Sequence, residues 1–77
     1  MKDFLTNLVK NIVDNPDKVA VEEKTDGGIT TLEIAVGPDD MGKIIGREGR
    51  IIKAVRDLVK ILAVKQNRRV NVVLREE

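Results

Sequence analysis

The chain contains no cysteine, histidine, serine, tyrosine or tryptophan. It therefore lacks the most frequent nucleophiles, the most frequent general base, and the nitrogen and sulfur ligands of zinc sites. Disulfides and thiol chemistry are excluded, which makes the cytoplasm the expected location. From these absences we expect a protein that is not an enzyme and that holds no metal or cofactor.

Aromatic residues and long apolar runs are also scarce. Phe4 is the only aromatic residue, and its place in a helical pattern predicts a core position. No apolar stretch approaches the length of about 18 residues that a membrane-spanning helix needs, and the N-terminus lacks the apolar core of a signal peptide. With 42% hydrophobic and 35% charged residues, the chain is expected to form one soluble domain over residues 1–77, with a thin core.

Positive charge is concentrated in the second half of the chain, although the net charge is only +1. Residues 1–36 carry four lysines against seven acidic residues, whereas residues 37–77 carry ten basic residues against six acidic ones. This asymmetry indicates an anionic partner for the second half.

Helical and alternating patterns predict six elements in the order α-β-β-α-α-β. The Asn15-Pro16 pair is expected to end the first helix, and Asp26-Gly27-Gly28 to form a hairpin turn between the first two strands. Together the elements predict an α+β fold, in which a three-stranded sheet packs on helices on one face. The expected helices span 3–15, 41–45 and 49 or 50 to 66, the last capped by Asn67, and the third strand spans 70–74.

Two adjacent carboxylates, Asp39 and Asp40, stand directly before the helix at 41–45. Paired carboxylates can serve as general acid and base in catalysis. Aspartate at the start of a helical pattern more often caps the first free N–H groups of the helix. We interpret this pair as a helix cap.

Two glycines, Gly46 and Gly49, interrupt the helical pattern of residues 41–61. The next helix begins at this loop, so its free N–H groups and the positive end of its dipole face the loop. Because glycine has no Cβ, a sugar-phosphate chain can approach the backbone closely. The loop could therefore clamp a phosphate backbone. Cations within reach are Lys43, Arg47 and Arg50.

The same spacing is also typical of a plain corner between two helices. In that interpretation Gly46 is a left-handed C-terminal cap and Gly49 a turn residue. Glu48 favours the corner, since its carboxylate repels phosphate unless it points away. Spacing alone leaves both interpretations open.

The run MGKIIGREGRIIKAVRDLV resembles the core of a KH domain, with an apolar pair, a Gly-x-x-Gly loop and an isoleucine at a fixed offset, here Ile52. The element order is that of the type II, bacterial form of the fold. The resemblance covers nearly the whole chain, so in extent this chain is similar to the small stand-alone bacterial KH proteins of the KhpA type. It implies single-stranded RNA as partner, with the loop holding the backbone of about four nucleotides. The implied RNA-binding residues are Lys43, Ile44, Ile45, Gly46, Arg47, Glu48, Gly49, Arg50 and Lys53.

The resemblance also implies a biological role. It suggests an RNA chaperone or post-transcriptional regulator that works as a homodimer or beside a larger KH-containing partner, with links to cell-wall homeostasis and cell length. Ile51 departs from the family, which commonly has a small polar or basic residue there. Since the second half of the chain has no aromatic residue to stack on bases, we expect weak binding with little sequence preference.

The long helix is expected to present an apolar stripe to the sheet. Its second half is apolar on nearly all sides, which is typical of a helix that buries a second face. We expect a partner or a second copy of the chain to cover that face, with coverage by neighbouring loops as the alternative. The expected stripe is Ile51, Val55, Leu58 and Leu62, with Ile52 and Val59 beside it, and the expected interface residues are Ala54, Ile61 and Val64.

Three cations, Lys53, Arg56 and Lys60, lie opposite that stripe. From the residues alone we interpret all three as part of a solvated face, with an extension of the RNA track as the alternative. Two rival functions stay open for the whole chain. One is a protein-interaction module that does not bind RNA, and the other is a DNA-binding helix-turn-helix, which the start of the second helix, Arg-Ile-Ile-Lys, fits poorly.

Overall fold

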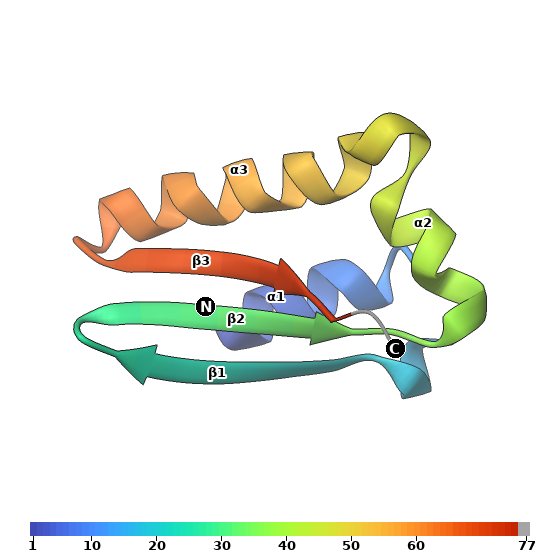
Figure 1. The fold of residues 1–77 in the computed structure, drawn as a ribbon, viewed down its shortest axis with the longest axis horizontal. Helices are drawn as coiled ribbons and strands as arrows, with labels where there is room; N and C mark the ends of the chain where they lie inside the picture. The colour runs from blue at the N-terminus through green and yellow to red at the C-terminus, as the bar shows by residue number, and fades with distance from the viewer. Residues whose placement is uncertain (76–77) are drawn as a thin grey trace.

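The predicted order of elements is confirmed by the structure, a computed structural model that describes residues 1–75 (Figure 1). Single 3₁₀ turns lie before the first strand, before the second helix and between the last two helices. The elements are α1 (Lys2–Lys10), β1 (Ala20–Asp26), β2 (Ile29–Ala35), α2 (Met41–Ile45), α3 (Arg50–Lys65) and β3 (Arg69–Leu74).

The sheet has the strand order β1-β2-β3. β1 pairs with β2 in antiparallel register, from Ala20 opposite Ala35 to Asp26 opposite Ile29. The hairpin turn needs two residues of positive φ, which Gly27 (58°) and Gly28 (80°) supply. β3 pairs with β2 in parallel, because α3 carries the chain back along the sheet.

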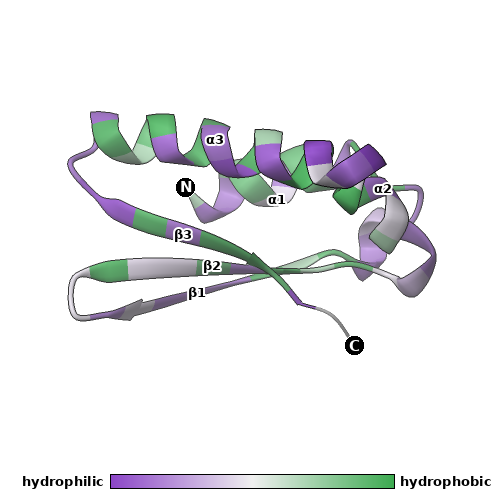
Figure 2. Cartoon of the chain, turned by 45° about the horizontal axis from the view of Figure 1, so that its top comes forward, coloured by the Kyte–Doolittle hydropathy of each residue, from purple (hydrophilic) through white to green (hydrophobic). Residues whose placement is uncertain are grey.

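All three helices lie on one face of this sheet (Figure 1 and Figure 2), and buried apolar side chains of the strands and helices form a single core cluster. Alternation along β2 and β3 sends every second side chain into that core. The expected α+β class, with helices on one face, is therefore confirmed. The side chains that are fully buried are Leu5, Val9, Leu32, Ile34, Ile44, Val59 and Asp40.

The long helix ends as the sequence predicts. Asn67 takes a left-handed conformation with φ 54°. Its N–H donates to the carbonyl of Val64 (3.1 Å), and the N–H of Arg68 donates to that of Ala63 (2.9 Å). This pair of bonds is a Schellman motif, which satisfies the last carbonyls of α3 and turns the chain into β3.

Two expectations about buried side chains are wrong. Phe4 is 41% exposed, because Leu5 and Val9 form the face of α1 that meets the sheet, and Phe4 lies about 100° away from Leu5 around the helix. In α3 the expected burial of Ile52, Val55 and Val59 is confirmed, but two other expected core residues are not buried, since Ile51 is 38% and Leu58 39% exposed. The buried residues of α3 are Ile52, Val55, Val59 and Ala63.

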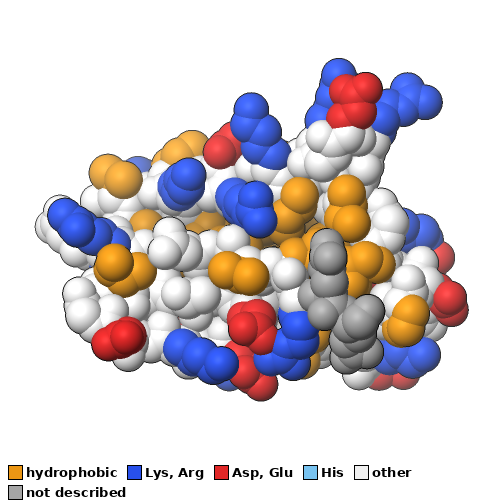
Figure 3. Space-filling view, viewed as in Figure 1, with side chains coloured by type: hydrophobic (Ala, Val, Ile, Leu, Met, Phe, Trp, Pro, Cys, Tyr) orange, Lys and Arg blue, Asp and Glu red, His pale blue; other side chains and the backbone are white. Residues whose placement is uncertain are grey.

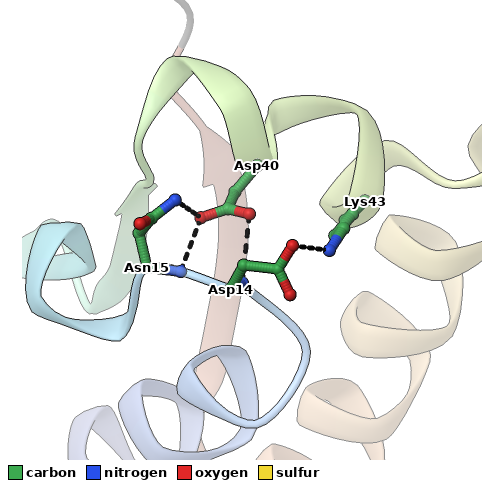
Figure 4. A network of polar contacts seen from close by, with 4 residues as sticks. All are labelled: Asp14, Asn15, Asp40 and Lys43. Atoms are coloured by element: carbon green, nitrogen blue, oxygen red, sulfur yellow. Dashed lines mark hydrogen bonds and ion pairs between the residues drawn. The ribbon is translucent and has the colours of Figure 1, made fainter.

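The first helix ends five residues earlier than expected, and a buried carboxylate explains the difference (Figure 4). Asp40 accepts hydrogen bonds from the backbone N–H of Asp14 (3.1 Å) and of Asn15 (3.0 Å), and from the side-chain amide of Asn15 (3.1 Å). These N–H groups are therefore directed to Asp40 and not to helix carbonyls. Lys43 of α2 pairs with the carboxylate of Asp14.

Asp40 thus has a different role from the one expected. It stands at the N-cap position of α2, but its side chain makes no capping hydrogen bond. Burial raises the pKa of Asp40, but the hydrogen bonds from Asp14 and Asn15 and the charge of Lys43 outweigh this and hold the pKa below its ordinary value of 3.8. The ionised carboxylate therefore ties the segment after α1 to the start of α2.

Because the buried carboxylate of Asp40 is ionised, we expect the fold to be sensitive to acid. A group whose pKa is lower in the folded state stabilises the fold above its unfolded pKa, near 3.8, and loses that contribution as pH falls through the folded value. We expect the thermal midpoint of the native chain to fall more steeply below about pH 4 than that of Asp40→Asn, which is less stable at neutral pH. Circular dichroism at a series of pH values measures both.

The exposed neighbour provides the control, since Asp39→Asn removes the same charge without touching Asp14 or Asn15. Its acid profile should follow that of the native chain. Equal slopes for the native chain and Asp40→Asn would show that Asp40 does not hold this part of the fold.

Candidate nucleic-acid interface

The loop between α2 and α3 depends on the backbone of Gly46. Its dihedral angles are φ 70° and ψ −172°, a region that is essentially restricted to glycine. A Cβ at this position would overlap the side chain of Ile51. Gly46 therefore ends α2 with positive φ, as expected, but with an extended ψ instead of the left-handed helical one. Ile51, half exposed, packs against it.

The next residues turn the chain into α3. Glu48 (φ 57°, ψ 28°) and Gly49 (φ 74°, ψ 14°) both have left-handed backbone. For Glu48 this costs roughly 1–2 kcal/mol, since left-handed backbone brings Cβ close to the following carbonyl. A Cβ at Gly49 would meet no atom within 4 Å. The outer side of Gly49 is therefore open to a ligand, whereas Gly46 is required by packing.

Charged side chains surround this turn. Arg47, Glu48 and Arg50 are exposed, and Figure 3 shows basic side chains gathered with an acidic one at the projecting tip of the molecule. The Glu48 carboxylate lies 3.7 Å from the Arg50 guanidinium. An exposed pair of this kind contributes little to stability. It does direct the negative charge of Glu48 toward Arg50.

The remaining predicted RNA-binding residues lie at different depths. Ile44 is fully buried in the core, whereas Ile45 and Gly46 are partly exposed. The ammonium of Lys43 is paired with Asp14. Lys53 is exposed, one turn into α3. The structure thus brings the loop, Ile45 and Lys53 to one end of the molecule and places Ile44 behind them as support.

All three predicted interface residues are exposed on α3. Ala54 lines an apolar groove between α1 and α3, and Ile61, 59% exposed, follows at helical spacing on the same side. Val64, 75% exposed, lies one turn after Ile61 and borders the hollow toward β3. Sequence reasoning missed the contribution of α1, because residues so far apart in the chain leave no local signal. The groove is lined by Leu8, Ile12, Ile51, Ala54, Val55 and Leu58.

Two further observations concern residues 1–75. None of their helices combines the length and the apolar character that crossing a bilayer requires. These residues also contain no group of three or more carboxylates positioned to hold a metal ion.

Comparison with known proteins agrees with this architecture. The family described as KhpA/KhpB, KH domain, matches residues 2–74. This chain belongs to that family. The KH fold implied by the sequence is therefore confirmed.

Similar proteins span almost the same length. RNA-binding protein KhpA of Clostridium acetobutylicum is 50% identical over 70 residues, which are 91% of this chain and 93% of that protein. RNA-binding protein KhpA of Chlamydia pneumoniae is 43% identical over 77 residues, 100% of this chain and 99% of that protein. The resemblance to the KhpA type of KH protein is therefore confirmed.

A solved structure shares the fold. A crystal structure of Aquifex aeolicus Era bound to GDP and AlF4⁻ superposes with a TM-score of 0.64 at 20% identity. The match covers 95% of this chain but only 28% of that longer one. At this identity the likeness concerns the fold alone.

Proposed function

We propose that residues 1–77 act as one non-catalytic KH domain that binds single-stranded RNA in the cytoplasm. The observation that carries this proposal is the loop from Gly46 to Gly49. It leaves the backbone at Gly49 uncovered at the N-terminal end of α3, with Arg47 and Arg50 exposed around it. Free N–H groups, a positive helix end and two guanidinium groups together suit a phosphate backbone. The relatives named RNA-binding protein KhpA support the same partner.

The proposed RNA-binding residues have different roles according to where they lie. The backbone from Gly46 to Gly49 contacts the sugar-phosphate chain, and Arg47 and Arg50 supply the charge. Ile45, partly exposed beside the loop, offers an apolar contact to a base, and buried Ile44 supports it from the core. Lys43 and Lys53 flank the track, Lys43 after leaving its pair with Asp14.

Binding of this kind is weak and tolerant of sequence. The only aromatic residue, Phe4, lies on α1, so no ring beside the loop stacks on a base, and a contribution of about 1–3 kcal/mol per base is missing. A protein that binds weakly and without base preference suits the role of an RNA chaperone or post-transcriptional regulator. The family resemblance supports this role and, with it, a part in cell-wall homeostasis and cell-length control.

A double variant of the loop, Arg47→Asp with Glu48→Asp, tests the proposal. Reversing the charge of Arg47 places two carboxylates where phosphate would lie, so we expect the affinity for a fluorescent single-stranded RNA to fall about ten-fold or more. Anisotropy over a salt series measures it, with circular dichroism as the test of folding. For the native chain, log affinity should fall linearly with log salt.

A matched control is Lys10→Glu, which makes the same change in net charge at the end of α1. It should bind nearly as the native chain does. If the folded loop variant and the native chain bind alike, or neither binds, the loop is only a corner between helices.

The exposed apolar side of α3 supports the second part of the proposal, an association through Ala54, Ile61 and Val64. The partner is a second copy of the chain or a larger KH-containing protein. Ile61 and Val64 are large apolar side chains that are mostly exposed, and the groove beside Ala54 extends the apolar surface toward α1. Two linked domains would raise a weak RNA affinity through multivalency. Without RNA binding, this surface would make the chain an interaction module alone.

Sedimentation of Ile61→Asp tests the homodimer. A charge at this position should convert a dimer to a monomer, because a buried unpaired carboxylate costs several kcal/mol. The conservative variant Ile61→Leu should keep the native mass. A native chain that is already monomeric, or a dimer that survives Ile61→Asp, would contradict self-association.

A further inference from the structure

Two of the three cations around the loop are paired with carboxylates of this chain. The guanidinium of Arg50 lies 3.7 Å from Glu48, within the loop itself. The ammonium of Lys43 donates to Asp14, which stands 29 residues earlier and outside the loop (Figure 4). A phosphate that binds Lys43 therefore competes with a carboxylate that the segment after α1 brings to the site.

The fold holds Asp14 in place through its backbone. Its N–H donates to one oxygen of the buried Asp40 carboxylate (3.1 Å), and the N–H of Asn15 donates to the other (3.0 Å). Val13, directly before Asp14, is buried in the core. None of these contacts uses the side chain of Asp14. The carboxylate is therefore presented to Lys43 by neighbours that a change of this side chain leaves in place.

The ion pair itself is open to solvent. The side chain of Asp14 is 73% exposed and that of Lys43 45% exposed. Exposed pairs contribute little to stability, so breaking this one costs little. Lysine also carries a point charge on a flexible four-carbon stem, so its ammonium can turn from one anion to another without moving the helix.

Lys43 lies close enough to the loop to make that exchange. Three residues separate it from Gly46, which is about 5 Å along α2. Carboxylate and phosphate oxygens accept the same charge-assisted hydrogen bonds from an ammonium group. When Lys43 turns to a phosphate, Asp14 loses the one ion-pair partner it has within residues 1–75. Binding through Lys43 therefore leaves an unpaired negative charge beside the RNA.

We propose that Asp14 is an intramolecular counter-ion that competes with RNA for Lys43 and so lowers the affinity of the loop. The inference rests on the proposed RNA binding and adds a residue that limits it. A strand that also contacts Arg47 and the loop backbone can displace Asp14, whereas a single phosphate at Lys43 only replaces one anion by another. Because Asp14 recaptures the ammonium when a phosphate leaves, it also favours release of the RNA.

Four proteins test this competition: the native chain, Asp14→Asn, Lys43→Gln and the two changes combined. Anisotropy of a fluorescent single-stranded RNA measures the affinity of each over a salt series. We expect Asp14→Asn to bind about three-fold more tightly than the native chain, the scale of an exposed ion pair. Its salt slope should be steeper by as much as about 0.7, as for one further phosphate contact. In the Lys43→Gln background the same change at Asp14 should alter the affinity much less, since no ammonium is left to release.

Two matched variants separate the ion pair from the general effect of charge. Asp14→Glu keeps the carboxylate and should bind as the native chain does. Asp17→Asn removes the same charge three residues later, where no cation within residues 1–75 lies within 4 Å of the carboxylate, and should also bind as the native chain does. The counter-ion is overturned if Asp14→Asn binds no more tightly than the native chain, if Asp17→Asn gains as much, or if the gain persists in full without Lys43.

A measurement on the native chain needs no variant. The NMR resonance of the side-chain carboxyl carbon of Asp14 should shift when single-stranded RNA is added, because Lys43 leaves the carboxylate. A resonance that stays in place while RNA binds would overturn the exchange.

The loop variant Arg47→Asp, Glu48→Asp separates this outcome from failure of the proposed function. If it loses RNA while Asp14→Asn binds as the native chain does, loop binding stands and the counter-ion falls. If the loop variant binds as the native chain does, or if the native chain does not bind RNA at all, the proposed function falls and the counter-ion falls with it.

Discussion

The backbone at Gly46 is the constraint on which the candidate site depends. Its dihedral angles are open only to glycine, and Ile51 occupies the space where a Cβ would stand. This close packing fixes the direction in which α3 leaves α2. Because α3 then starts at the tip of the molecule, its free N–H groups and the positive end of its dipole face solvent and not the core. The strained turn at Glu48 and the open side of Gly49 follow from the same geometry.

A buried carboxylate anchors the other side of this arrangement. Asp40 binds the segment after α1 to the start of α2, with a pKa held below its ordinary value. Lys43, one turn later, is paired with Asp14 of the same segment. An RNA that draws Lys43 toward its phosphates would therefore act on the contact between α1 and α2. Lys43 therefore belongs both to the fold and to the proposed RNA site, so that RNA binding and the stability of the domain would influence each other.

Local signals in the sequence were sufficient for the elements and most of their ends. The glycine pair at 27–28, the break at Gly46 and the cap at Asn67 each depend on one backbone conformation, and the structure confirms all three positions. The KH resemblance predicted how the elements pack. The residues of the proposed RNA-binding loop could be named from the sequence because the Gly-x-x-Gly motif is contiguous in the chain.

Contacts between distant residues could not be predicted. The hydrogen bonds that the N–H groups of Asp14 and Asn15 donate to Asp40 join positions 26 and 25 residues apart, and nothing near Asp40 distinguishes it from a helix cap. Ile51 and Leu58 were wrongly expected in the core because two neighbouring faces of α3 are both apolar, and only packing against the sheet decides between them. The sequence also did not indicate that Arg68 and Arg69 line one hollow together with Lys60, because it is the turn after α3 that brings them back beside Lys60.

The central claim is that RNA backbone lies on the loop between α2 and α3. Amide chemical shifts of the isotope-labelled chain, followed by NMR during titration with single-stranded RNA, test it most directly. The account predicts the largest shifts at the amides from Gly46 to Arg50, with smaller ones continuing to Lys53. Shifts confined to the groove between α1 and α3, around Leu8 and Leu58, or no shifts at all, would contradict it.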